Sequence, residues 1–412
     1  MILILLGSVF GFFMAWGIGA NDVANAMGTS VGSKALTITQ ALIVAAIFES
    51  AGAILVGGQV TDTIRSQVVI VPPGQAESLV YGMMAALLAA GTWLCVASFF
   101  GWPVSTTHSI VGALIGFAWF EFGREAVHWR EVLDIFASWI VTPLIAGFIA
   151  YWLFVSEVRL IFYSKNPISN AKRYVPVYIF LTVFVIAMVT LTKGLKHLHW
   201  TLDIFHSMAY STLIALICAL YGVVAMKRLA LCENSQELSH KLAQVERIFA
   251  VLMIFTACAM AFAHGSNDVA NAIGPVAAII AVVHTGSVEA TGKVPVWVLV
   301  FGAIGIVTGL AMYGHKVIAT VGNNITELTP SRGFAASLAT ASTVVVASGT
   351  GLPVSTTQTL VGAILGIGVA RGFYSLNLKV IQSVFMSWLI TLPAGAFLAI
   401  LFFSIIKLLS GL

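Results

Sequence analysis

The chain has 412 residues, of which 59% are hydrophobic and only 9% are charged, and its formal net charge is +4. A soluble domain usually carries about 25% charged residues, so this composition excludes an ordinary soluble protein. The small positive charge comes from lysines and arginines between apolar segments and gives no indication of nucleic-acid binding. Apolar runs of about 20 residues recur along the chain, which predicts an all-α, polytopic membrane protein in the lipid bilayer.

Twelve apolar segments follow one another, and each is a candidate transmembrane helix. The first segment has no basic region before it, which favours a membrane helix over a cleaved signal peptide. The segments lie near residues 2–20, 38–58, 79–100, 104–120, 132–155, 174–192, 205–226, 248–264, 295–313, 334–350, 353–371 and 382–408.

Glycine and proline interrupt the apolar pattern at two places. Segments three and four are nearly continuous and are separated by Gly101-Trp102-Pro103, while residues 349–353 (GTGLP) separate segments ten and eleven. A break of this kind inside an apolar stretch predicts a helical hairpin or a discontinuous helix.

Two short sequences recur in the second half of the chain, 246 to 250 residues after their first copy. Residues 19–26 (GANDVANA) return as residues 265–272 (GSNDVANA), and we name these the first and second Asn-Asp motifs. Residues 103–107 (PVSTT) return unchanged as residues 353–357. The chain is therefore predicted to contain an internal repeat.

The repeat divides the chain into two halves and a spacer. Segments one to five (residues 1–155) form the first repeat, and segments eight to twelve (residues 248–412) form the second. Segments six and seven lie in the spacer, residues 156–247. Equivalent elements are seven crossings apart, and an odd number reverses the orientation. The repeats are thus predicted to be inverted, as in many secondary transporters that bind substrate at the midplane.

The charges between segments predict the orientation in the membrane. Thirteen lysines and arginines follow odd-numbered segments, whereas six follow even-numbered ones. By the positive-inside rule, the first set of loops is cytoplasmic and both termini lie outside. The longest polar stretch, residues 227–247, is then a cytoplasmic connector, and its mixed charges predict a short surface helix.

The two PVSTT sequences predict an anion site. Proline suits the first turn of a helix, and the next three residues bring hydroxyl groups to a helix N-terminus. Free backbone N–H groups and the positive end of the helix dipole favour an anion there. Two such termini from opposed hairpins would surround one small oxyanion.

The Asn-Asp motifs predict a cation site. Asn21 and Asn25 are four residues apart and share a helix face, with Asp22 beside them. Flanking glycines would permit local unwinding, and unwound carbonyls together with Asn and Asp oxygens suit a hard monovalent cation. Glu49, in the middle of segment two, is either a third cation ligand or a proton site. His108 and His264 are interpreted as polar residues satisfied near helix ends rather than as proton relays.

Charge balance connects the two kinds of motif. A dibasic phosphate in a low-dielectric site needs compensating charge, and no lysine or arginine lies near either motif pair in the sequence. Cations bound by Asp22 and Asp268 would supply it, so anion binding would depend on cation binding. A carboxylate could also accept the hydrogen bond of the phosphate proton. Whether these aspartates contact the anion or only the cations stays open.

The paired Asn-Asp motifs, PVSTT in both halves, residues 245–249 (VERIF) and residues 63–65 (TIR) resemble the inorganic phosphate transporter (Pit) family over essentially the whole chain. The resemblance implies a twelve-segment symporter in the cell membrane, phosphate at the hairpin tips, cations near the Asn-Asp motifs and a homodimer. The predicted phosphate-binding residues are Ser105, Thr106, Thr107, Ser355, Thr356, Thr357, Asp22 and Asp268. The predicted cation ligands are Asn21, Asp22, Asn25, Asn267, Asp268, Asn271 and Glu49.

These features predict a secondary active importer of inorganic phosphate that works by alternating access. Oxygen-only ligands favour sodium as the coupling ion, and no other cofactor is expected. Three alternatives stay open: a proton-coupled phosphate or metal–phosphate symporter, a sulfate permease of the same fold, and an anion channel. An enzyme or an ATP-driven pump is disfavoured because the sequence has neither a nucleotide-binding loop nor a nucleophile elbow.

Overall fold

The computed structural model describes residues 1–100, 102, 104–195, 202–229, 237–286, 294–315, 318, 329–372 and 378–410. The described part is almost entirely helical. Ten of its helices are long and apolar enough to cross a membrane, so the chain is a multi-pass membrane protein. Helices are the expected solution because each satisfies its own backbone hydrogen bonds without water.

Each of the twelve predicted segments overlaps one long helix, and α3 is an additional short helix that was not predicted. Two of the twelve, α5 and α13, have only 17 and 16 residues and are not among the ten candidate spans. Helix α10 has 14 residues but continues as a π-helix to Gly314, and together they are long enough to cross. The helices are α1 (Ile2–Gly32), α2 (Ile38–Val56), α3 (Gly58–Ser66), α4 (Ala76–Phe100), α5 (Thr106–Phe122), α6 (Trp129–Glu157), α7 (Pro167–Thr192), α8 (Ile204–Lys227), α9 (Leu238–Thr285), α10 (Val296–Gly309), α12 (Pro330–Thr350), α13 (Thr356–Arg371) and α14 (Leu378–Ser410).

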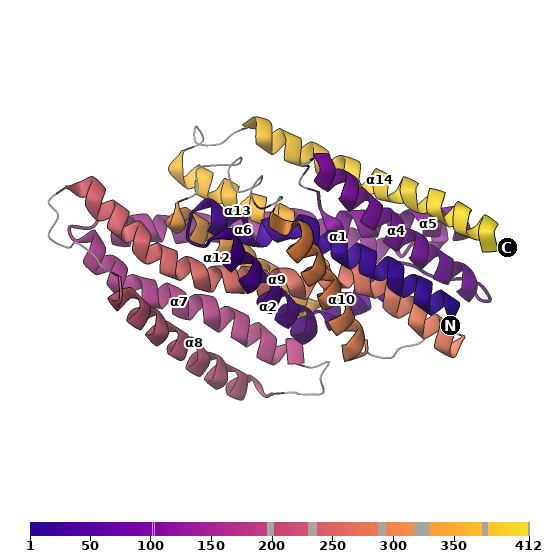
Figure 1. The fold of residues 1–412 in the computed structure, drawn as a ribbon, viewed down its shortest axis with the longest axis horizontal. Helices are drawn as coiled ribbons and strands as arrows, with labels where there is room; N and C mark the ends of the chain where they lie inside the picture. The colour runs from indigo at the N-terminus through magenta and orange to yellow at the C-terminus, as the bar shows by residue number, and fades with distance from the viewer. Residues whose placement is uncertain are drawn as a thin grey trace.

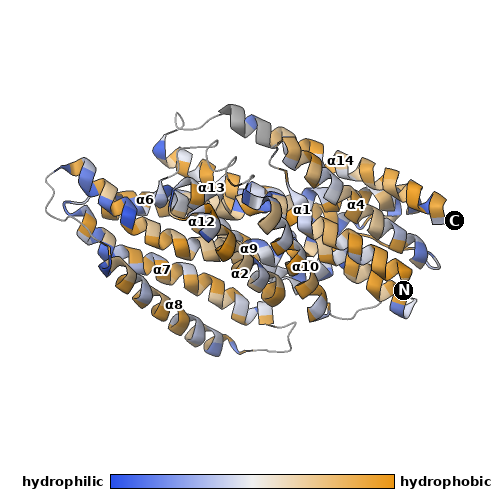
Figure 2. Ribbon diagram, viewed as in Figure 1, coloured by the Kyte–Doolittle hydropathy of each residue, from blue (hydrophilic) through white to orange (hydrophobic). Residues whose placement is uncertain are grey.

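The outer surface is apolar, as a bilayer requires. Helices α7 and α8 pack against each other along one side, and α14 lies along the opposite side (Figure 1). Hydrophobic residues dominate these outer helices, while hydrophilic residues gather where α7, α8 and α9 approach their connections (Figure 2). The start of α1 and the end of α14 lie at the same end of the molecule.

The helices that carry the Asn-Asp motifs are longer than predicted. Helix α1 runs to Gly32 instead of ending near residue 20, and α9 is one helix of 48 residues. The predicted unwinding at the motifs is therefore wrong, because both motifs are helical throughout. The predicted short surface helix in residues 227–247 is wrong from Leu238 onward, where the residues form the first turns of α9, and residues 230–236 lie outside the described part of the chain.

Close helix packing explains the glycines that flank the motifs. A Cβ atom on Gly19 would lie 1.9 Å from the carbonyl oxygen of Ile306 on α10. A Cβ atom on Gly265 would lie 2.1 Å from the carbonyl oxygen of Glu49 on α2. The glycines bring backbones into contact, as small residues do between membrane helices, and leave the helices intact.

Replacing Gly19 with alanine is expected to destabilise the protein, since the added methyl group would meet backbone. Overpacking of this kind costs about 1–3 kcal/mol. Gly17 on the same helix is the matched control, because its Cβ atom would meet Leu94 Cδ1 at an ordinary 3.4 Å. Thermal unfolding of the purified variants in detergent tests this, and equal melting temperatures for G17A and G19A would refute the packing argument.

Two hairpins bring helix N-termini into the middle of the bundle. The α4–α5 connection passes through residues 101–105, of which Gly101 and Pro103 lie outside the described residues. The α12–α13 connection turns at Gly351, with φ +82°, as the Gly/Pro signal predicted. Pro353 precedes the helix, which begins at Thr356, so its predicted place in the first turn is wrong.

The helix contacts of the first half have equivalents in the second half, in which each helix is replaced by its counterpart in the repeat. Helix α1 packs on α4 and α10, whereas α9 packs on α12 and α2. Likewise, α5 packs on α14, and α13 packs on α6. Helices of each half therefore pack against helices of the other half. The two hairpins meet between α1 and α9.

Candidate anion and cation site

The two Asn-Asp motifs lie side by side in the centre of the molecule, on α1 and α9, which pack against each other. Both carboxylates, Asp22 and Asp268, are fully buried. The four asparagines of the motifs are buried as well: Asn21, Asn25, Asn267 and Asn271. Burying amides and carboxylates in an apolar bundle costs free energy. A duplicated set of them therefore indicates a functional site.

The hairpin helices begin with serine caps. Ser105 Oγ accepts a hydrogen bond from the His108 N–H at 3.3 Å, and Ser355 Oγ accepts one from the Gln358 N–H at 3.2 Å. The two serines thus order the first turns of α5 and α13. The other N–H groups at the start of each turn have no acceptor within their own helix, which makes them potential donors to a ligand.

The first threonine of each hairpin binds the aspartate of its own half. Thr106 Oγ1 donates to Asp22 Oδ2 at 2.8 Å, and Thr356 Oγ1 donates to Asp268 Oδ2 at 3.0 Å. These matched bonds attach each helix N-terminus to an Asn-Asp motif. The anion and cation sites predicted from separate motifs are therefore adjacent.

The second threonine of each hairpin binds the other hairpin. Thr107 Oγ1 donates to the Val354 carbonyl at 3.0 Å, and Thr357 Oγ1 donates to the Val104 carbonyl at 3.3 Å. The two tips are consequently in direct contact. The positive ends of α5 and α13 meet at this contact.

One asparagine of each Asn-Asp motif forms a hydrogen bond with a threonine of the other half. Asn25 Nδ2 donates to Thr357 Oγ1 at 2.7 Å, and Asn271 Nδ2 donates to Thr107 Oγ1 at 3.2 Å. Each second threonine thus connects an asparagine of the opposite half to a carbonyl of the opposite hairpin. All the predicted Ser, Thr, Asn and Asp residues are brought together in one buried cluster.

Two serines belong to this cluster although they were not predicted. Asn21 Nδ2 donates to Ser98 Oγ near the end of α4, and Asn267 Nδ2 donates to Ser348 Oγ near the end of α12 at 3.2 Å. Ser98 and Ser348 are 250 residues apart and so hold equivalent places in the repeat. That spacing was the available signal for finding them.

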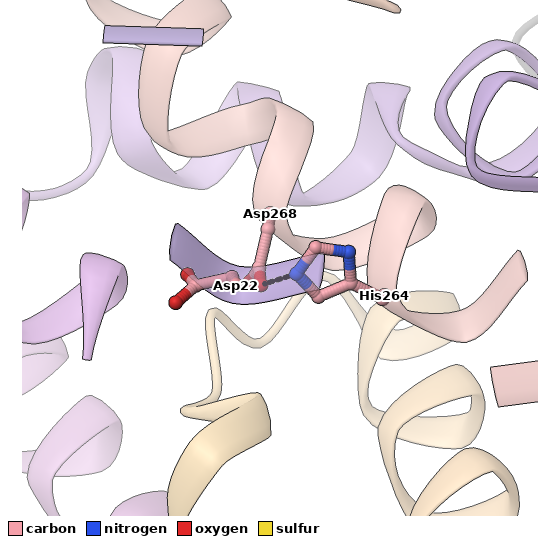
Figure 3. Close-up of side chains that lie close together, drawn as sticks. All are labelled: Asp22, His264 and Asp268. Carbon is pink, nitrogen blue, oxygen red and sulfur yellow. Dashed lines mark ion pairs between the residues drawn. The ribbon is translucent and has the colours of Figure 1, made fainter. Parts of the chain in front are cut away.

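His264 lies inside the site, so its interpretation as a polar residue at a helix end was wrong. Its Nε2 lies 2.9 Å from Asp268 Oδ2, and its Nδ1 lies 3.1 Å from Glu49 Oε1. One ligand atom each from Asp22, His264 and Asp268 lies within 4.8 Å of the others, and Figure 3 shows the ion pair between His264 and Asp268 with Asp22 beside it. The four-residue spacing from His264 to Asp268 on α9 could have indicated the pair.

The second motif presents several buried oxygen atoms that have no hydrogen-bond partner among the described residues. They are Asn267 Oδ1, Asp268 Oδ1 and Asn271 Oδ1, together with Glu49 Oε2. Buried polar atoms are rarely left unpaired, and carbonyl and carboxylate oxygens are the ligands of hard cations. These oxygens are therefore candidate ligands for a cation at the second motif.

His108 differs from His264, because its ring points away from the motifs. It stacks on Trp139, with ring centroids 3.8 Å apart. Gln358 holds the equivalent place 250 residues later, and both side chains lie behind the hairpin tips, where they line a cavity.

Paired hairpins, a buried polar centre and a sheath of apolar helices define a membrane transporter rather than an enzyme. The profile of the phosphate transporter family matches residues 18–399, and the chain belongs to that family. Its membership makes the protein a phosphate transporter, as the sequence motifs predicted.

Relatives and a solved structure resemble the chain over nearly its full length. A protein of Haemophilus influenzae named "Putative phosphate permease" is 52% identical, with 98% of this chain and 97% of that protein aligned. The chloroplastic inorganic phosphate transporter 2-1 of Arabidopsis thaliana is 40% identical, over 96% of this chain and 70% of that one. A sodium-dependent phosphate transporter of known structure is 38% identical with a TM-score of 0.92, covering 99% of this chain and 100% of that chain.

Proposed function

We propose that the protein is a sodium-coupled importer of inorganic phosphate in the cell membrane that works by alternating access. The contact between two hairpin tips beside two buried aspartates carries this proposal. Its similarity to a sodium-dependent phosphate transporter supports the choice of coupling ion.

Phosphate would bind between the hairpin tips. The first-turn N–H groups of α5 and α13 supply donors, and the hydroxyl groups of Thr107 and Thr357 can turn from carbonyl acceptors to the anion. Such bonds to a charged acceptor are stronger than those to a neutral carbonyl. Ser105 and Ser355 would hold the two helix starts in place, while Thr106 and Thr356 connect the anion to the aspartates.

Sodium would bind at the Asn-Asp motifs. Asp268, Asn267, Asn271 and Glu49 each offer one oxygen that has no hydrogen-bond partner in the described part of the chain, and Asp22 contributes the matching carboxylate of the first half. A dibasic anion next to these carboxylates would be repelled unless cations were present. Each ligand would thus raise the affinity for the other, which is the coupling that symport requires.

Proton coupling is the second candidate, and the His264 bridge between Glu49 and Asp268 favours it. An imidazole between two carboxylates can pass a proton from one to the other. In that case the same residues would carry protons, and the anion site would be unchanged.

Residues 1–155 and 248–412 would move as inverted repeats around the hairpin contact, with residues 156–247 as a spacer and both termini outside. The exchanged helix contacts of the two halves support this assignment. Because α9 begins at Leu238, the boundary of the second repeat falls within one helix. A homodimer stays a prediction, to be checked by the mass of the purified protein.

Uptake of radiolabelled phosphate into proteoliposomes tests the function. The arms are an inward sodium gradient, an inward proton gradient and no gradient, each with and without excess sulfate. Accumulation with sodium alone and without inhibition by sulfate is expected. Accumulation with protons alone would select the second candidate, inhibition by sulfate would require a sulfate assay, and equilibration without a gradient would indicate a channel.

A further inference from the structure

A cavity of about 750 Å³ lies behind the hairpin tips, between α6, α13 and α14. This volume is in the range of sites that bind drug-sized molecules, about 300–1,000 Å³. Its wall is mostly apolar and includes Phe136, Ile140, Leu144, Phe148, Leu365 and Leu389. The cavity is separate from the Asn-Asp motifs and has no place in the transport site described above.

The innermost part of the cavity is polar. His108 and Gln358, in the first turns of α5 and α13, are only 2% and 6% exposed, and Trp388 on α14 is 8% exposed. The His108 ring lies beside the Gln358 side chain and the Trp388 backbone and interacts with both. Gln358 Oε1, Trp388 Nε1 and the two ring nitrogens of His108 nevertheless form no hydrogen bond of good geometry within the described part of the chain. Buried polar atoms are ordinarily paired, so three such side chains facing one cavity indicate a ligand that pairs with them.

The opposite end of the cavity faces the bilayer. Leu144 on α6 and Leu389 on α14 line it and are 68% and 69% exposed, on helices that cross the membrane. The described residues around the cavity include no aspartate, glutamate, lysine or arginine. A ligand would therefore come from the lipid phase and carry no charge at its polar end.

We propose that this cavity binds a membrane-soluble, uncharged amphiphile with an apolar body and a hydroxyl end, such as a long-chain alcohol. The hydroxyl oxygen would accept from Trp388 Nε1, and the hydroxyl proton would go to Gln358 Oε1 or a His108 nitrogen. A phospholipid head group does not fit, because it is charged and belongs at the membrane surface rather than behind the hairpin tips.

A molecule in this cavity would also slow transport. It would hold the first turns of α5 and α13 against α6 and α14, directly behind the capped residues that meet at the phosphate site. This consequence rests on the proposed alternating access, whereas binding itself does not. Labelling and transport are therefore measured separately.

A long-chain alcohol with a photoreactive diazirine on its chain is the probe, used on the purified full chain in lipid nanodiscs. Saturable labelling within residues 136–148 and 385–392, read by mass spectrometry, is expected. A non-reactive alcohol should compete with the probe, whereas an alkane of the same length should compete less, because it offers no group to His108, Gln358 and Trp388.

Two variants narrow the mouth of the cavity: Leu144→Trp and Leu389→Trp. Both positions face lipid, so folding should be kept, which size-exclusion chromatography verifies. Leu213→Trp on α8, a lipid-facing position remote from the cavity, is the matched control. Saturable labelling should be lost in the first two variants and kept in the third.

Labelling that does not saturate, or that is equal in all three variants, would overturn the proposal. The cavity would then be filled by bulk lipid or water. The proposal would also be overturned if a second copy of the chain covered the cavity. The protein would then form dimers through α6 and α14, and these dimers would not be labelled. Phosphate uptake with and without the alcohol then measures the effect on transport. Loss of uptake under all conditions would count against the proposed function and not against binding.

Discussion

Replacing Asp268 with asparagine is expected to lower the rate of sodium-driven phosphate uptake roughly ten- to hundredfold while leaving the protein folded. The carboxylate is buried between the Thr356 hydroxyl at 3.0 Å and His264 Nε2 at 2.9 Å. Asparagine keeps the size and one oxygen but loses the charge that would hold a cation. Interactions of charged groups are worth about 1.5–3 kcal/mol, which corresponds to an initial rate roughly ten- to hundredfold lower.

The measurement is the initial rate of uptake at several sodium concentrations, together with the effect of sodium on the melting temperature. Asp22→Asn should behave in the same way, because Asp22 holds the equivalent place beside Thr106. Asp134→Asn, an exposed position on α6, makes the same chemical change as a control and should transport normally. Near-normal, sodium-dependent uptake by both motif variants would rule out the cation assignment.

Removing the hydroxyl groups of Thr107 and Thr357 is expected to weaken phosphate binding. Valine has nearly the same shape, so Thr107→Val with Thr357→Val keeps the side-chain volume and removes the two hydroxyls. These hydroxyls donate to carbonyls of the opposite hairpin and accept from Asn271 and Asn25. A hydrogen bond to a charged group contributes about 1.5–3 kcal/mol, so the double variant should raise the KM for phosphate by roughly a hundredfold or more. Uptake against phosphate concentration at saturating sodium measures this.

Thr182→Val provides a matched control for the threonine variants. Thr182 is also fully buried, but its hydroxyl donates to the Tyr178 carbonyl within α7 at 2.8 Å, remote from the hairpin tips. Its KM should be unchanged. If the double variant kept the KM of the unaltered protein, the hydroxyls would serve only to join the hairpins.

Local patterns were sufficient to predict the helices and most residues of the site. Apolar runs long enough to cross a bilayer form helices wherever they occur, since unpaired backbone groups are not tolerated in lipid. The Gly/Pro signal at residues 349–353 correctly indicated a turn, because Gly351 adopts a positive φ that other residues rarely take. Repetition of the Asn-Asp and PVSTT sequences identified the buried polar cluster without any knowledge of its contacts.

The same local reasoning was wrong about Gly19 and Gly265. Glycine beside a polar group is typical of both an unwound helix and a tightly packed one, and the sequence contains nothing that separates the two. Which of the two occurs depends on the segment that packs against the glycine. For Gly19 this is the backbone of Ile306 and for Gly265 that of Glu49, each more than 200 residues away in the chain. Helices α1 and α9 accordingly continue through the motifs.

What the sequence alone determined is the class of protein, its helices, its repeated motifs and the chemical types of residue in the site. Only the tertiary structure decided which atoms meet: His264 between Glu49 and Asp268, each second threonine across the hairpin contact, and a cavity behind His108 and Gln358. The physical reason is that periodicity and composition act over a few turns of helix. Hydrogen-bond partners in this site are joined over separations of up to 332 residues, where only the packing of whole helices sets the register.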